Sequence, residues 1–343
     1  MTDKQWNDLL EVIDGKLFSP MPAGFIIDSP WLPGWCGETI LDYFTSDLIW
    51  FESNRKAVQA FPDCLFLPGF WSEYGMCSEP SAFGSVPVFT ENSFPHAKPC
   101  LHSIEEADHL RTPDPSTDGL APFMLNRLRK HEQKLAAIGH RIRFSVSRGP
   151  LNIATHLLGT SEFLLAMKMD PERTHRLLRI ITEYLAGWHR LQASAFPRID
   201  GMLILDDIIG FIGEDDFKEF GMPYFRELFS RDVRVRFLHN DAHCEASLPH
   251  LADLGINLFN MAFDTNLNDL KEATRNRIVM LGNIPPRDVL AAGSPEDVKK
   301  AVRSLAGSLK DRSRIVLSCG GGMPPGVSTA NISAFLEAVH ELK

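Results

Sequence analysis

Residues 233–241 read VRVRFLHND, a short β-rich run that ends in an imidazole, an amide and a carboxylate. The run is too short for a helix, and it has the composition of a buried strand. At the end of such a strand, polar groups reach the edge of the sheet, where a ligand can meet them. This segment therefore predicts both a sheet and a functional site at one of its edges.

Seven further runs of the same kind occur along the chain, each ending in glycine or polar residues. The full set is GFIID (24–28), CLFLPGF (64–70), RIRFSVSRG (141–149), GMLILDD (201–207), VRVRFLHND (233–241), INLFNMAF (256–263), RIVMLGN (277–283) and RIVLSCGG (314–321). Several of these runs are apolar throughout, which is typical of strands buried on both faces of a parallel sheet.

Helix signals alternate with the runs from residue 141 onward. Asp170-Pro171-Glu172 and Ser294-Pro295-Glu296 each supply an N-cap, a first-turn proline and an acid. Helices are expected at 161–169, 170–196, 213–230, 248–254, 268–275, 294–310 and 328–342. The alternation predicts right-handed βα units, and eight strands favour an α/β fold with a (β/α)8 barrel. An open doubly wound sheet is the alternative, but no G-x-G-x-x-G follows the first strand.

We expect one barrel domain over residues 1–343, with a helical N-terminal extension at 1–23. The region 71–125 fits the alternation least well, because it is rich in Gly, Pro, Ser and aromatic residues. We interpret it as a long, partly extended insertion between strand and helix, near the mouth of the barrel. A surface Ω-loop is the alternative interpretation.

Composition excludes several classes of function. The 343 residues carry a net charge of −9, which argues against binding nucleic acid or an acidic membrane surface. No apolar run approaches the ~20 residues that span a bilayer. Six scattered cysteines indicate free thiols in a reducing compartment. We expect a cytoplasmic enzyme with a small-molecule substrate and with neither a nucleic-acid nor a membrane partner.

The strand ends supply a candidate metal site. In a barrel, side chains at the carboxyl ends of the strands surround one mouth, which holds the active site. His239 and Asp241 are two residues apart and point to the same side of an extended chain. With the thiol of Cys319, at the end of the last strand, they are candidate zinc ligands that leave one position open. The alternative is a histidine hydrogen-bonded to an aspartate, with a small buried cysteine.

Three further charged residues are candidate catalytic groups. Asp206 and Asp207 are adjacent at a strand end, so only one of them should enter the mouth, where it can bind a cation or accept a proton. Arg148 can bind a carboxylate or phosphate through its planar guanidinium, or form a salt bridge with a neighbouring acid.

Candidate cofactor-binding residues are Trp71, Asn260 and Asn283, which also follow predicted strands. Trp71 and nearby aromatic residues can line a pocket for a large flat ligand, although core packing is the commoner role of such residues. Asn283 precedes a sharp turn, where a structural role is the alternative.

A family resemblance adds to this interpretation. From about residue 75 to 343 the chain resembles the uroporphyrinogen decarboxylase-like superfamily, which includes the decarboxylase itself, methyl-corrinoid:thiol methyltransferases and a barrel of cobalamin-independent methionine synthase. The resemblance implies a (β/α)8 barrel. The matching stretches include GPLNIATHLLG (149–159), LDDIIGFIGEDDFKEFGMPYF (205–225), FLHND (237–241), LGNIPPRDVLAAGSPEDV (281–298) and LSCGGGMPPGVSTANISAF (317–335).

Two departures decide which branch the chain resembles most. The decarboxylases carry an early R-Q-A-G-R-Y motif that binds substrate carboxylates, whereas DSPWLPGWCGETI (28–40) contains no arginine. The methyltransferase branch has a His-x-Cys zinc motif and a later cysteine. His239 and Cys319 match this pattern, and Asp241 replaces the first cysteine. Glu79 matches an acid that approaches the metal in that branch.

The resemblance implies a zinc-assisted methyltransferase that moves a methyl group from a methyl-corrinoid donor to a thiol or another nucleophile. A small corrinoid protein is the expected partner. One alternative is a decarboxylase for a tetrapyrrole or another acid, with substrate contacts from Arg148 and Asp206 or Asp207. A second alternative is a non-catalytic barrel that binds a corrinoid or a partner protein.

Overall fold

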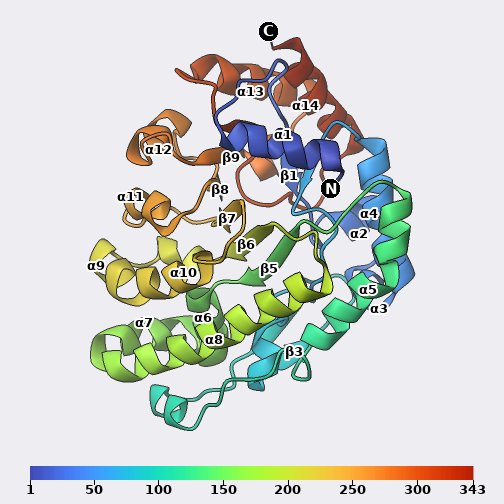
Figure 1. The fold of residues 1–343 in the computed structure, drawn as a ribbon. Coiled ribbons are helices and arrows are strands. Elements are labelled where there is room, and N and C mark those ends of the chain that lie inside the picture. The colour runs from blue at the N-terminus through green and yellow to red at the C-terminus, as the bar shows by residue number, and fades with distance from the viewer. Residues whose placement is uncertain (343) are drawn as a thin grey trace.

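Eight parallel strands form the wall of the barrel, one within each run predicted above. The computed structural model describes residues 1–342. The strands are β1 (Gly24–Ile26), β2 (Leu65–Leu67), β5 (Phe144–Arg148), β6 (Gly201–Leu205), β7 (Val235–His239), β8 (Leu258–Asn260), β9 (Val279–Ile284) and β10 (Ile315–Cys319). Helices surround them, with α6 to α12 on one side and α2 to α5 on the other (Figure 1). The predicted (β/α)8 barrel is confirmed.

Hydrogen bonds join the strands in the order β10-β9-β8-β7-β6-β5, and β1 pairs with β2. A parallel bridge between Ala23 and Leu317 connects β1 to β10. In the described part of the chain no ladder joins β2 to β5, so one interval of the ring lacks strand pairing.

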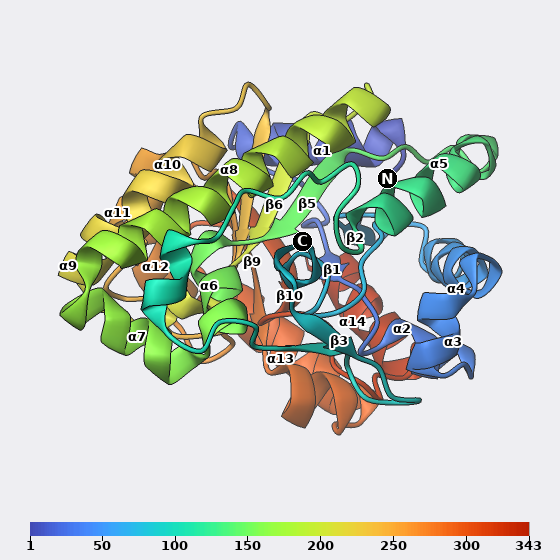
Figure 2. The same cartoon turned by 90° about the horizontal axis from the view of Figure 1, so that it is seen from below.

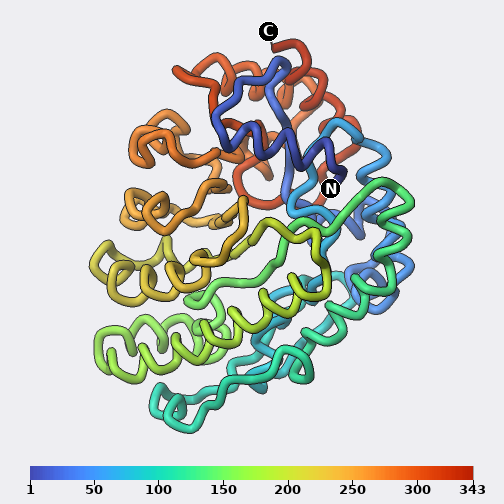
Figure 3. Tube along the Cα trace, in the orientation of Figure 1, coloured from blue at the N-terminus to red at the C-terminus, as the bar shows by residue number. Residues whose placement is uncertain are grey.

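Side chains close this interval. Leu65 and Leu67 of β2 pack in one inner cluster with Phe144 and Val146 of β5. At the amino end of the strands, Met1 accepts a hydrogen bond from the backbone of Arg141 (2.8 Å). Figure 3 shows the blue start of the chain beside the green segment that leads into β5.

Helix α1 closes the amino end of the barrel. A capping box at Thr2 starts the helix, and its buried face contributes Trp6, Leu9 and Leu10 to the inner cluster. The Trp6 ring meets the Phe144 ring edge to face at 5.5 Å. The helix occupies part of the predicted extension at 1–23. Because α1 covers this end, access to the barrel interior is from the opposite mouth.

The remaining helices agree with the predicted ranges and add to them. The α-helices are α1 (Asp3–Ile13), α2 (Leu32–Cys36), α3 (Ile40–Thr45), α4 (Asp47–Ala60), α5 (Ala121–Ala137), α6 (Pro150–Leu158), α7 (Thr160–Met169), α8 (Pro171–Ala195), α9 (Glu214–Asp216), α10 (Met222–Phe229), α11 (Leu248–Leu251), α12 (Leu267–Ala273), α13 (Pro295–Ser308) and α14 (Thr329–Glu341). Short 3-10 or π turns are η1 (Pro80–Phe83), η2 (Ile104–Asp108), η3 (Asp207–Gly210), η4 (Phe217–Gly221), η5 (Ala252–Leu254) and η6 (Pro286–Ala291). Helices lie at all seven predicted ranges, whereas α2 to α6 were not among the expected elements.

The segment 71–125 contains an antiparallel hairpin of β3 (Val86–Val88) and β4 (His96–Lys98), between η1 and η2. Figure 2 shows α1 and this hairpin at opposite ends of the barrel. The insertion is therefore partly extended and lies at the mouth, as predicted. Among residues 1–342, none of the helices combines the length and the apolar character that a membrane crossing requires.

Candidate active site

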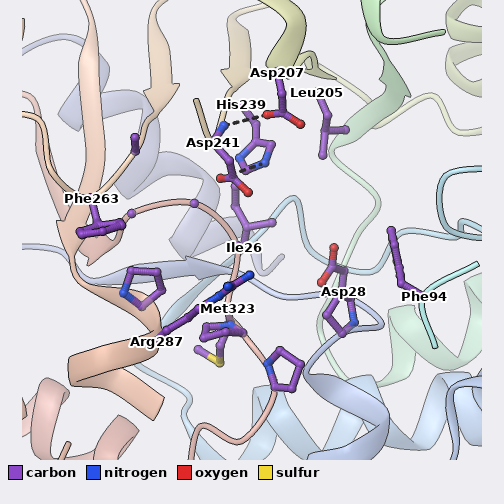
Figure 4. Close-up of a pocket in the computed structure, with 18 of the residues that line it drawn as sticks. Ile26, Asp28, Phe94, Leu205, Asp207, His239, Asp241, Phe263, Arg287 and Met323 are labelled. Carbon is purple, nitrogen blue, oxygen red and sulfur yellow. Dashed lines mark hydrogen bonds and ion pairs between the residues drawn. The ribbon is translucent and has the colours of Figure 1, made fainter. Parts of the chain in front are cut away.

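A cavity of about 650 Å³ opens at the carboxyl ends of the strands (Figure 4). This volume lies within the usual range for small-molecule sites. The lining combines acids, one histidine, two arginines and apolar residues from the ends of all eight barrel strands and from the insertion. It includes Ile26, Asp28, Trp71, Phe94, Arg148, Asp207, His239, Asp241, Phe263, Arg287, Asp288 and Met323.

The hydrogen bonds of Asn260 fix the tautomer of the neutral His239 ring. Nδ2 of Asn260 donates to the carbonyls of Leu281 (2.7 Å) and Cys319 (3.5 Å), so its Oδ1 faces the imidazole. Oδ1 is 2.8 Å from Nδ1 of His239 and can only accept a hydrogen bond. Nδ1 of the neutral ring therefore carries the proton. Nε2 keeps a lone pair, which makes it available as a base or a metal ligand.

Two carboxylates lie beside this imidazole. Oδ1 of Asp241 is 3.5 Å from Nε2 of His239. The backbone N–H of Asp241 donates to Oδ1 of Asp207 at 2.7 Å (Figure 4). Burial raises the pKa of Asp207. Gly321, at φ +69°, makes room for Asp241, because a Cβ atom there would lie 2.2 Å from its Oδ1.

Asp206 does not line the cavity, although it was a predicted catalytic residue. The fully buried carboxylate accepts hydrogen bonds from the backbone N–H groups of Leu151 (3.0 Å), Asn152 (3.2 Å) and Ile208 (3.1 Å). Burial raises its pKa to about 8 against the effect of these donors. Asp206 therefore caps the start of α6, and of the adjacent pair only Asp207 enters the mouth.

Arg148 is held by two acids and is not free to bind a substrate carboxylate. Its Nη2 is 3.1 Å from Glu73 and its Nη1 is 3.2 Å from Glu79, and all three side chains are at most 5% exposed. Burial raises the pKa of Glu73, and the arginine opposes this shift. The salt-bridge interpretation of Arg148 is thus the one that the contacts support. Because Glu73 follows β2 and Arg148 ends β5, the ion pair spans the unpaired interval of the barrel.

The predicted zinc ligands do not form a metal site. Cys319 is fully buried in the cluster that faces the outer helices, its thiol contacts the Gly321 carbonyl at 3.7 Å, and burial raises its pKa to about 12. Glu79 is occupied by Arg148 and does not line the cavity. Across residues 1–342, no group of three or more His, Cys, Asp and Glu side chains is arranged to hold a metal ion. The residues present therefore do not fit a catalytic zinc.

Strand alternation explains the position of Cys319. Val316 belongs to the inner cluster, so Leu317 and Cys319 point outward to the helices. His239 lies two residues after the inward-facing Phe237, so its side chain points inward, unlike that of Cys319. We had expected every side chain at a strand end to face the mouth, but the alternation of sides along a strand places His239 in the mouth and Cys319 among the helices.

Of the three candidate cofactor-binding residues, only Trp71 lines the cavity. Its indole N–H donates to the Ile27 carbonyl at 3.2 Å. Asn260 orients His239 as described above. Asn283 donates to the carbonyls of Ala262, Phe263 and Thr265 and so holds the loop after β8. Two of the three therefore have structural roles.

The sequence matches the family described as uroporphyrinogen decarboxylase (URO-D) over residues 69–342. The chain belongs to the uroporphyrinogen decarboxylase family. Among its relatives, uroporphyrinogen decarboxylase of Chlorobium limicola is 25% identical over 256 residues, which cover 71% of each chain. The enzyme of Hahella chejuensis is 24% identical over 278 residues, covering 77% of this chain and 75% of the relative.

Solved structures support the fold of this family member. A methyltransferase from Methanosarcina mazei superposes with a TM-score of 0.83 at 18% identity, covering 98% of both chains. A B12-independent methionine synthase from Shewanella sp., in complex with selenomethionine, gives a TM-score of 0.51 at 12% identity, covering 86% of this chain and 90% of that one. Known members of the superfamily are enzymes, and these neighbours share the barrel with this chain.

Two charged residues of this family member were not assigned a role from the sequence. Asp28 follows β1, and its end-of-strand position was the available signal. Arg287 lies in η6, directly after Pro285 and Pro286, and reaches into the cavity (Figure 4). An arginine one turn beyond a strand end is a weak signal, since most such residues face solvent.

Proposed function

We propose that the protein is a methyltransferase in which His239 removes a proton from the methyl acceptor. The observation that carries the proposal is the hydrogen bond from Nδ1 of His239 to Asn260, because it leaves Nε2 as a base at the mouth. A thiol or another protic nucleophile becomes much more nucleophilic when such a base removes its proton. This form of the proposal has no zinc step.

The neighbouring acids support this role of His239. When Nε2 takes the acceptor proton, the imidazolium lies within 3.5 Å of the Asp241 carboxylate, which stabilises the positive charge. The backbone of Asp241 is itself held by Asp207. The electron pair released on the acceptor forms the new bond to the methyl carbon, and the pair of the broken bond stays with the donor.

A methyl-corrinoid is the donor that we propose, carried on a small partner protein. When bound, it supplies an electrophilic methyl group, and the chain supplies the pocket, the base and the exclusion of competing acceptors. A cavity of about 650 Å³ that opens at the mouth leaves room for a second reactant beside a small acceptor.

Decarboxylation of uroporphyrinogen is the second candidate, favoured by relatives of that name at 24–25% identity. Its substrate carries eight carboxylates and would need several cations. The cavity is lined by Asp28, Asp207, Asp241 and Asp288, whereas its arginines are Arg148, which two glutamates already hold, and Arg287. This charge balance favours methyl transfer.

The test uses the full chain with methylcobalamin and a panel of thiols, and loss of the methyl-cobalt absorbance is followed anaerobically. We expect turnover that falls at least about 100-fold in His239→Gln. His243→Gln is the matched control, because His243 lies in the same loop, pairs with Asp264 (2.9 Å) and does not line the cavity. Coproporphyrinogen formation from uroporphyrinogen, without methyl transfer, would refute the proposal.

A further inference from the structure

Two oppositely charged side chains reach into the cavity without a partner in the protein. Asp28 and Arg287 both line it, and no hydrogen bond or ion pair joins either side chain to another residue of 1–342. The other central charges are occupied, since Arg148 binds Glu73 and Asp241 contacts His239. Burial penalises the charged form of Asp28, so a cationic ligand beside it would stabilise the carboxylate.

The two groups come from different parts of the barrel. Asp28 follows β1, whereas Arg287 extends from η6 after β9, and Figure 4 shows them on opposite sides of the opening. They form no ion pair with each other in the described chain, so one ligand can meet both only with a cation at one end and an anion at the other. Asp288 lines the cavity too; like Arg287 it is exposed to water at the rim, whereas Asp28 lies deeper and is only partly exposed.

We propose that the acceptor is a small zwitterion, with a carboxylate bound by Arg287 and an ammonium group bound by Asp28. The role of this ligand as methyl acceptor rests on the proposed function, whereas its binding rests only on the residues that line the cavity. The guanidinium of Arg287 can bind the ligand carboxylate through two parallel hydrogen bonds. The aromatic ring of Phe94 lines the cavity on the same side as Asp28 (Figure 4) and suits an alkylated ammonium group at that end of the ligand.

Neither a purely cationic nor a purely anionic ligand satisfies this cavity. A cation alone leaves Arg287 unpaired, and a carboxylate alone leaves Asp28 to face the acids around it. The ionisable groups that act on Asp28 are Glu73, Asp241 and Arg148. Burial raises the pKa of Asp28 well above its usual value, Glu73 and Asp241 add to the shift and Arg148 opposes it. Binding an ammonium group should therefore release a proton from Asp28.

The test is calorimetric titration of the full chain with three probes of similar shape. Glycine betaine carries both charges, choline lacks the carboxylate, and 3,3-dimethylbutanoate replaces the ammonium nitrogen with carbon. We expect betaine to bind at least about tenfold more tightly than either of the others. Titrations in two buffers of different ionisation enthalpy should reveal proton release with betaine and choline only.

Variants assign each charge to its residue. Asp28→Asn should weaken betaine and choline about tenfold, abolish the proton release and leave 3,3-dimethylbutanoate unchanged. Arg287→Gln should weaken betaine and 3,3-dimethylbutanoate and leave choline unchanged. Arg303→Gln, an exposed arginine on α13 that pairs with Glu296 and Glu341, is the matched control and should change nothing.

Three outcomes would overturn the inference: no binding of any probe, equal binding of betaine and 3,3-dimethylbutanoate, or equal binding of betaine and choline. Because these titrations need no methyl donor, they separate the two proposals. If betaine binds as expected but no acceptor is methylated, the methyltransferase proposal fails while the zwitterion site stands. If uncharged thiols are methylated but no probe binds, the zwitterion site fails alone.

Discussion

Replacement of Arg148 by methionine tests whether the buried ion pairs hold the mouth together. The guanidinium lies 3.1 Å from Glu73 and 3.2 Å from Glu79, with all three side chains at most 5% exposed. Methionine keeps much of the volume but leaves two buried carboxylates without their cation. Removing one partner of a buried ion pair costs about 3–5 kcal/mol. At about 2.1 cal/mol/K of unfolding entropy per residue, this chain should lose roughly 4–7 °C in Tm.

The loss should depend on pH in a defined direction. Burial already raises the pKa of Glu73, and without Arg148 this pKa should rise further. A carboxyl group whose folded-state pKa lies above its unfolded value destabilises the fold as the pH rises between the two values. The difference in unfolding free energy between Arg148→Met and the unmodified chain should therefore be larger at pH 8 than at pH 5.

Urea denaturation followed by circular dichroism measures both effects. Arg173→Met is the matched control, because Arg173 also contacts two carboxylates, Asp108 (2.9 Å) and Asp170 (2.8 Å), but is 38% exposed. We expect that control to lose less than about 1 kcal/mol. The reasoning would be refuted if, at pH 8, Arg148→Met lost no more unfolding free energy than Arg173→Met. It would also be refuted if the loss in Arg148→Met became larger as the pH was lowered.

Three further predictions concern glycines and metal content. Gly149→Ala should cost about 1–3 kcal/mol in urea denaturation, because its Cβ would lie 2.2 Å from Oδ2 of Asp206. Gly213→Ala, another helix N-cap in extended backbone but with open space around it, should cost clearly less; equal losses would argue against crowding. Gly321→Ala should cost about 1–2 kcal/mol for its left-handed backbone and should lower the methyl-transfer rate by displacing Asp241, so an unchanged rate would contradict the role of that carboxylate. Protein purified without added metal should contain far less than one zinc per chain by mass spectrometry, and a full equivalent would show that the ligands assemble after all.

The strands could be predicted because each is a local signal. All eight runs, from Gly24–Ile26 to Ile315–Cys319, form strands of the barrel wall. Parity within a run was also accessible, and it predicted that only one of Asp206 and Asp207 enters the mouth, without identifying which. The same argument applied to Cys319 would have placed its thiol on the helix side, outside the cavity that His239 lines.

Partners that come from the insertion could not be predicted. Arg148 is held by Glu73 and Glu79, more than 60 residues earlier in a segment without periodic signals. Whether an arginine at a strand end binds a ligand or a buried acid depends on this long-range packing. The absence of a partner for Asp28 is likewise a property of the fold, because it depends on every side chain around the cavity.

The interval between β2 and β5 makes one line of the barrel wall depend on side chains that can take up a proton. Elsewhere in the wall, backbone hydrogen bonds, which do not titrate, join neighbouring strands. Between β2 and β5, the contact near the mouth is the ion pair of Arg148 with Glu73, and burial raises the pKa of Glu73. Protonation of that glutamate would weaken its contact with Arg148, leaving Glu79 as the remaining acid on the guanidinium, while the paired strands are unaffected.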